Sequence, residues 1–133
     1  MKKRILFCIT VILFGIYACS DDIEHQIDGM WQLQTIEENG ITSPIDTVFY
    51  SFMKGKVFSY TILKTPDAAN VFYGYIDALS EKEMLINIDG KFFQSLKENS
   101  DWEEPQRVFG IENINSRELV LSSGGKTYSF KKH

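Results

Sequence analysis

The sequence predicts an all-β domain, an antiparallel up-and-down meander closed into a barrel of about eight strands. Fifteen of the 18 aromatic residues lie after residue 20, in short runs where apolar and polar side chains alternate, a pattern typical of half-buried strands. Turn residues break these runs at short intervals, and no heptad, long apolar helix or internal repeat follows the first 20 residues. Because closing a small sheet removes its exposed edges, we favour a barrel over the alternative, a β-sandwich.

Turn residues divide the first half of the chain into four expected strands. Asn39-Gly40 ends the first strand, and Lys54-Gly55 joins the second and third strands as a tight hairpin. A loop containing Pro66 and Asp67 precedes the fourth strand. The expected strands are Met30–Glu38, Asp46–Met53, Lys56–Lys64 and Asn70–Ala78.

Side-chain alternation assigns faces to these strands, since successive residues of a strand point to opposite sides. In the third strand, one face carries Phe58, Tyr60 and Ile62. In the fourth strand, one face carries Val71, Tyr73 and Tyr75, and the other carries Phe72 and Ile76. Strands two to four therefore have apolar residues on both faces, although a small barrel needs only one apolar face.

The second half contains one segment with two interpretations. After a fifth strand at Glu83–Ile88, Asp89-Gly90 favours a hairpin turn, which would make Lys91–Lys97 another strand. Phe92, Phe93 and Leu96 also suit one turn of helix packed over an open barrel end, and both interpretations stay open. The remaining elements are a polar loop at Glu98–Pro105 and strands at Val108–Asn113, Glu118–Ser122 and Lys126–Lys132, the last two joined through Gly124-Gly125.

The first 18 residues are organised as a signal peptide. Lys2, Lys3 and Arg4 precede an apolar core from Ile5 to Ala18. A helix of that core would reach about 21 Å, short of the roughly 30 Å hydrocarbon thickness of a bilayer. The end of the core, Ile16-Tyr17-Ala18-Cys19, resembles the bacterial lipoprotein signal, in which an aliphatic, a variable and a small residue precede the lipidated cysteine. The resemblance implies removal of residues 1–18 and a lipid anchor on Cys19, which would attach the protein to a membrane.

The residues after Cys19 indicate on which membrane and on which side of it the protein would lie. Ser20-Asp21-Asp22 resembles the short acidic export tag of Bacteroidota-type lipoproteins, which implies an outer-membrane protein facing the cell exterior. The alternatives are that the segment is only a solvated tether, and that the protein lies on the periplasmic face. We expect residues 19–27 to form an acidic tether and residues 28–133 to form the barrel.

Charge argues against a nucleic-acid-binding protein, and cysteine content argues against a disulfide bond. The net charge of the whole chain is −4, and removal of residues 1–18 takes away three of the 14 basic residues and none of the 18 acidic ones, leaving −7. A surface of that sign repels phosphate backbones, so we expect no nucleic-acid partner. Since Cys8 lies in the signal and Cys19 would carry lipid, we expect no disulfide.

A short motif at the start of the first strand suggests a family. Gly29-Met30-Trp31 resembles the Gly-x-Trp motif with which lipocalins open their first strand. Together with the meander, Asp28–His133 is similar to the lipocalin-like, calycin-type domains of small Bacteroidota lipoproteins. The resemblance implies that Gly29 and Trp31 plug the closed end of the barrel.

Two other features of the family are not matched as clearly. Lipocalins carry a Thr-Asp-Tyr-type turn between late strands, which the segment from Asn113 to Arg117 does not match. They also place an arginine over the tryptophan after the final strand. The nearest candidates here are Arg117, before the last hairpin, and Lys131 and Lys132.

The sequence offers no convincing reaction centre. The two histidines are His25, in the expected tether, and His133, the last residue, so no rigid base for nucleophilic catalysis is apparent. His25 with Asp21, Asp22 and Glu24 is the one cluster that resembles a metal site, and we interpret it as a solvated linker. We therefore expect no enzyme, catalytic residue, metal or cofactor.

Aromatic residues supply the remaining functional candidates. We expect a small apolar or amphipathic ligand entering the open end of the barrel, with a pocket wall formed by Tyr50, Phe58, Tyr60, Tyr73 and Tyr75. The alternative is a module that binds a protein or glycan on the cell surface without an internal ligand. Trp102, Glu103 and Glu104 would form that surface patch.

Overall fold

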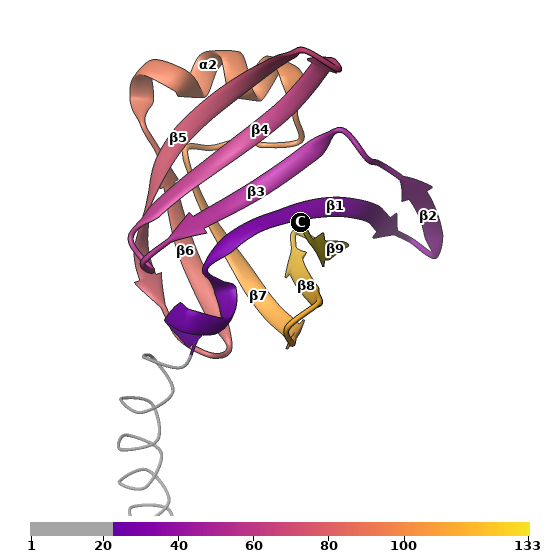
Figure 1. The fold of residues 1–133 in the computed structure, drawn as a ribbon, viewed down its shortest axis with the longest axis vertical. Helices are drawn as coiled ribbons and strands as arrows, with labels where there is room; N and C mark the ends of the chain where they lie inside the picture. The colour runs from indigo at the N-terminus through magenta and orange to yellow at the C-terminus, as the bar shows by residue number, and fades with distance from the viewer. Residues whose placement is uncertain (1–22) are drawn as a thin grey trace, which may run out of the picture.

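The computed structural model describes residues 23–133, so the expected signal peptide and Cys19 lie outside the described residues. The strands form one antiparallel sheet in the order β2-β1-β3-β4-β5-β6-β7-β8-β9, and β1 also pairs with β9. Eight of them, β1 and β3 to β9, therefore close a barrel, and β2 is an extra strand beside β1 (Figure 1). The strands are β1 (Gly29–Glu38), β2 (Ile41–Pro44), β3 (Val48–Met53), β4 (Val57–Thr65), β5 (Ala68–Leu79), β6 (Glu83–Ile88), β7 (Gln106–Ile114), β8 (Glu118–Ser123) and β9 (Lys126–Lys132).

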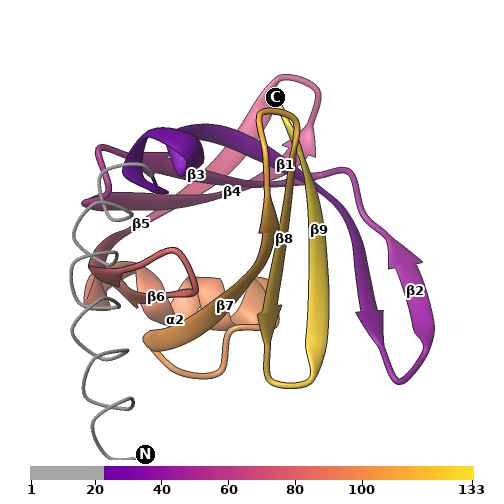
Figure 2. The ribbon, with the colours of Figure 1, turned by 90° about the horizontal axis from the view of Figure 1, so that it is seen from below.

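Strand β1 closes the barrel by pairing with β3 and β9, and its second half extends beyond β3 to pair with β2. Its first residues pair with β3, where Trp31 faces Tyr50, and its later residues pair with β2, where Thr35 faces Pro44. Its other edge pairs with β9, with a register shift between Leu33 and Thr35. The β1–β2 hairpin consequently projects from one side of the barrel (Figures 1 and 2).

The hairpins predicted at Lys54-Gly55 and Gly124-Gly125 are confirmed. Lys54 and Gly55 have φ of 54° and 65°, Gly124 and Gly125 have φ of 58° and 80°, and Asn39-Gly40, predicted only to end a strand, also forms a hairpin turn. Two successive positive φ values match the right-handed twist of the flanking strands. The sequence missed strand β2, because its four residues are all exposed and show no alternation.

The ambiguous segment after β6 is a helix, α2 (Gly90–Asn99). The Asp89 side chain caps it by accepting a hydrogen bond of 3.1 Å from the Lys91 backbone N–H. Leu96 is buried, and Phe92 and Phe93 pack against the core. Helix α2 therefore lies across one end of the barrel, here called the open end (Figure 1).

The opposite, closed end is sealed by residues 23–27, which are helical. Ile23 and Ile27 are buried, and the Ile27 carbonyl accepts a hydrogen bond of 2.8 Å from the Trp31 indole N–H. The expected boundary at residue 28 is thus wrong, because two isoleucines within the predicted tether pack against the barrel. Among residues 23–133, no helix is long and apolar enough to cross a membrane.

Candidate functional site

A cavity of about 400 Å³, open to solvent on one side, lies beside the segment that follows α2 and reaches inward-facing residues of the barrel. One wall is apolar and comes from β1, the β2–β3 connection, β3 and β4. Its residues are Leu33, Ile36, Ile45, Val48 and Ile62. The other wall is polar and consists mainly of Tyr50, Tyr60, Tyr128 and Asp101. The cavity therefore offers both an apolar and a hydrogen-bonding surface to a small molecule.

Two tyrosines of the polar wall have unused hydrogen-bonding capacity. Tyr50 and Tyr60 are 1% and 5% exposed, and their ring centroids are 5.3 Å apart. Within residues 23–133, neither hydroxyl has a hydrogen-bond partner. Burial raises the pKa of both phenols, and the negative charge of Asp101 adds to this effect. Both groups are consequently neutral hydroxyls at neutral pH and can donate or accept a hydrogen bond.

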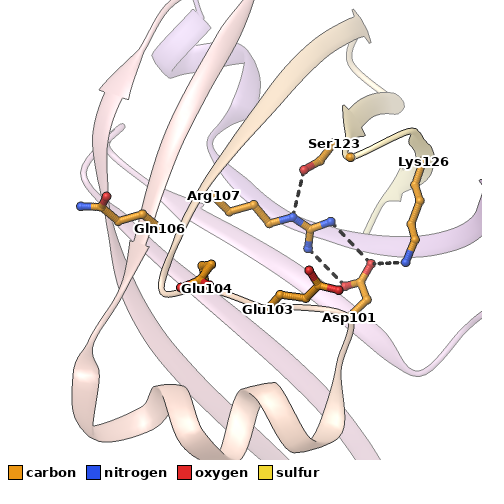
Figure 3. Close-up of a pocket in the computed structure, with 8 residues that line it drawn as sticks. Asp101, Glu103, Glu104, Gln106, Arg107, Ser123 and Lys126 are labelled. Carbon is orange, nitrogen blue, oxygen red and sulfur yellow. Dashed lines mark hydrogen bonds and ion pairs between the residues drawn. The ribbon is translucent and has the colours of Figure 1, made fainter.

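Asp101 and Tyr128 of the polar wall form a cluster with Arg107 and Lys126, which we call the clasp. Figure 3 shows Asp101, Arg107 and Lys126 of this cluster. The Arg107 guanidinium donates to both Asp101 carboxylate oxygens, at 3.2 and 3.5 Å. Lys126 Nζ lies 3.4 Å from Asp101 Oδ2. Tyr128 donates its hydroxyl proton to the same oxygen and accepts from Arg107. The clasp thus joins the segment after α2 to β7 and β9.

Aromatic rings and burial set the electrostatics of the clasp. The Arg107 guanidinium lies 5.1 Å from the Trp102 ring centroid and 4.6 Å from that of Phe109. Burial alone would raise the pKa of Asp101, but Arg107, the Tyr128 hydrogen bond and Lys126 lower it below its ordinary value. Asp101 is therefore an ionised carboxylate whose oxygens are already occupied.

A second, polar pocket of about 240 Å³ lies beside the clasp (Figure 3). Glu103, Glu104, Gln106 and Ser123 line it together with clasp residues. Ser123 accepts a hydrogen bond of 3.0 Å from Arg107 Nε. Asp101 lines both spaces, so the clasp forms the partition between the apolar cavity and this polar pocket.

The structure brings together only part of the expected pocket wall. Tyr50 and Tyr60 line the cavity, and Phe58 is buried deeper, 5.9 Å from the Trp102 ring centroid. Tyr73 and Tyr75 are 49% and 55% exposed, so their assignment to the pocket wall is wrong. The physical reason is alternation along β5, which turns Phe72 and Ile76 inward and the two tyrosines outward.

The expected surface patch is also not formed. Glu103 and Glu104 are exposed, but Trp102 is 1% exposed and packs between Phe58 and Phe109. Its indole N–H has no hydrogen-bond partner within residues 23–133. Trp102 therefore belongs to the core, and the prediction that it lies at the surface with the two carboxylates is wrong.

The closed end holds the Gly-x-Trp motif and its cation. Trp31 is fully buried, and Lys132 Nζ lies 4.4 Å from its ring centroid. Of the three candidate cations for this place, the structure thus selects Lys132. Gly29 has φ of 117°, and a Cβ there would lie 2.6 Å from Lys132 Nζ. The glycine is required both for its backbone conformation and for the approach of the lysine.

Sequence reasoning missed the clasp. Asp101 lies in a polar loop, Arg107 directly precedes the strand expected from Val108, and Tyr128 lies more than 20 residues further along the chain. Alternation did place Tyr128 on one face with Phe130, but nothing in the pattern indicates which charged residues meet it. Among residues 23–133, no group of histidine, cysteine, aspartate or glutamate side chains could hold a metal ion.

The eight-stranded antiparallel barrel, the helix over its open end and the internal cavity define a calycin-like architecture. Residues 11–133 match the family described as the lipocalin-like domain. The chain belongs to this family.

Two solved structures resemble the chain along most of its length. A lipocalin-like protein from Bacteroides uniformis is 25% identical, with a TM-score of 0.73, and the match covers 81% of this chain and 99% of that one. An uncharacterized protein from Bacteroides eggerthii is 24% identical, with a TM-score of 0.69, covering 80% and 99%. No curated protein matches the chain.

Proposed function

We propose that the protein is a non-enzymatic, lipid-anchored binding protein that holds a small amphipathic ligand in the internal cavity. The observation that supports this most strongly is the pair of tyrosine hydroxyls on its polar wall, which have no hydrogen-bond partner within residues 23–133. These hydroxyls open onto the cavity, where water can reach them. A ligand that hydrogen-bonds to Tyr50 and Tyr60 would replace that water.

The walls of the cavity indicate the chemistry of the ligand. Its apolar part would lie against Leu33, Ile36 and Val48. Its polar group would hydrogen-bond to the Tyr50 and Tyr60 hydroxyls, which can donate or accept, because the Asp101 oxygens already accept from the clasp. A cavity of about 400 Å³ falls within the range of small-molecule sites.

We assign no reaction to this cavity. Its titratable groups are Asp101 and three tyrosines. The carboxylate has a lowered pKa and the tyrosines have raised pKa values, so none of them exchanges a proton readily near neutral pH. Binding without catalysis is the function that fits this arrangement, and the proposal involves no nucleic acid.

The membrane anchor and the location are part of the proposal and rest on the sequence. Cys19, preceded by Ile16-Tyr17-Ala18, would carry the lipid, and Ser20-Asp21-Asp22 favours the outer membrane with the barrel facing the exterior. We expect Cys19→Ala to release the protein from membranes into the soluble fraction. Continued retention of this variant in the membrane fraction would refute lipidation.

Ligand binding can be tested by blocking the cavity. Ile36, half-buried, lines it, whereas Ile41, on β2, is 70% exposed and does not. We expect Ile36→Trp to abolish binding of an environment-sensitive hydrophobic dye, and the matched variant Ile41→Trp to leave it unchanged. Native mass spectrometry of protein purified from its own host should show a bound small molecule.

A result that refutes the internal ligand site can be stated for the same variants. If the two tryptophan variants bind the dye equally and the purified protein carries no small molecule, the internal ligand site is refuted. The function would then lie on the outer surface, as the alternative of a protein- or glycan-binding module requires.

A further inference from the structure

The outer surface of β3, β4 and β5 carries exposed apolar side chains at the closed end. Met53 and Tyr75 both pair with Val57, so these three residues form one row across the strands. Met53 is 60% exposed and Tyr75 is 55% exposed. The neighbouring row starts at Met30, which is 38% exposed, and ends at Tyr73, whose ring centroid lies 5.6 Å from that of Phe92 on α2 and therefore toward the open end. We call Met53, Val57, Tyr75 and Met30 the closed-end face.

The described chain begins beside this face. A Cβ on Gly55, in the β3–β4 turn, would lie 2.6 Å from the Glu24 side chain, so the helical turn at residues 23–27 touches that hairpin. The Lys54 backbone N–H also donates a hydrogen bond of 2.9 Å to the Asp28 carboxylate. The N-terminal segment is thus fastened next to Met53.

Chain length then limits where a membrane can lie. Cys19 precedes Ile23 by four residues, and four residues span at most about 14 Å even when fully extended. If Cys19 carries the lipid, its bilayer lies within that distance of the closed end. The open end, with α2, lies at the other end of the barrel (Figure 1).

We propose that the closed-end face rests on the lipid surface that holds the anchor, so that the cavity opens away from the membrane. This inference depends on the lipid anchor of the proposed function. Tyrosine and methionine side chains suit the boundary between headgroups and acyl chains, because tyrosine combines an apolar ring with a polar tip. Lys54 and Lys56, exposed on the adjoining turn, lie at headgroup level.

The charges near this face determine how salt affects the contact. Lys54 and Lys56 are offset by Glu24 and Asp28, which lie against the same hairpin. Attraction to anionic headgroups is therefore small, and apolar contact supplies most of the binding. The contact should persist on neutral phosphatidylcholine vesicles and depend little on salt.

The test uses the lipid-modified protein and one thiol at a time. After residue 19 the chain contains no cysteine, so Met53→Cys supplies the only free thiol for a nitroxide label. Ile41→Cys is the matched control, since Ile41 is an exposed apolar residue at the far end of β1. Both proteins are placed in phosphatidylcholine vesicles, and the collision rate of each label with a water-soluble nickel complex is measured.

We expect transfer from detergent to vesicles to reduce the collision rate at residue 53 several-fold and to leave that at residue 41 unchanged. Equal, unchanged rates at both positions would overturn the inference. Broadening of the residue 53 signal that increases with protein density would also overturn it, because a second copy would then cover the face.

The intact mass of the same protein separates the two proposals. A mass that includes a diacylglyceryl group, together with unprotected labels, refutes only the membrane contact and leaves the anchor standing. A mass without the lipid refutes the anchor, and the orientation proposed here fails with it.

Discussion

At the scale of single residues, Gly29 shows how a backbone conformation serves a side-chain contact. Its φ of 117° is unfavourable for any residue with a Cβ, and that Cβ would displace Lys132 from Trp31. We expect Gly29→Ala to lower the free energy of unfolding by about 1–3 kcal/mol. The measurement is urea unfolding followed by circular dichroism.

Gly90→Ala is the control for that variant. Gly90 begins α2, has no positive φ and has nothing within 4 Å of an added Cβ. Alanine favours helix by up to about 1 kcal/mol relative to glycine, so its unfolding midpoint should stay the same or rise. Equal losses of stability in the two variants would contradict the role given to Gly29.

The buried tyrosines predict a dependence of stability on alkaline pH. The pKa values of Tyr50, Tyr60 and Tyr128 are raised above the ordinary 10.0, chiefly by burial. The unfolded chain therefore releases protons near pH 10 that the folded protein retains, so stability is full below pH 10 and falls as pH rises above it. Tyr60→Phe should reduce the steepness of that fall by up to about 1.4 kcal/mol per pH unit. Urea unfolding between pH 8 and 11 measures it, and an unchanged slope would contradict the burial of this phenol.

At the scale of elements, the clasp holds the segment after α2 against the barrel. Asp101→Asn would remove the charge that Arg107 and Lys126 share, so we expect a loss of about 1–3 kcal/mol in the free energy of unfolding. Amide hydrogen exchange should become faster, most strongly at residues 99–106. Glu103→Gln is the matched control, because this neighbouring carboxylate is exposed and is not part of the clasp. A uniform acceleration over the barrel, or the same change in the control, would argue against a local clasp.

The elements also show what a sequence can and cannot reveal. Alternation located eight strands because one face of each had to be buried, and the paired turn residues marked the hairpins. Strand β2 escaped because its exposed residues carry no such constraint. On β5, alternation separates Tyr73 and Tyr75 from Phe72 and Ile76, but it does not show which face is inward because both faces carry aromatic rings.

At the scale of the whole molecule, the candidate site depends on contacts across long stretches of chain. The sequence supplied Tyr50 and Tyr60, since each lies on the inward face of a recognisable strand. The clasp joins Asp101 to Tyr128, and closure joins β1 to β9 across nearly the whole domain. Periodicity reports local structure only, so neither the partners of Asp101 nor the burial of Trp102 could be predicted.

The central claim is that the cavity beside Tyr50 and Tyr60 holds a ligand. The most direct measurement is a crystal structure of the protein purified from its own host, with the cavity examined for bound density. The account predicts an amphipathic molecule whose polar atom lies within hydrogen-bond distance of the Tyr50 or Tyr60 hydroxyl. Ordered water bonded to both hydroxyls, with no other density in the cavity, would contradict it.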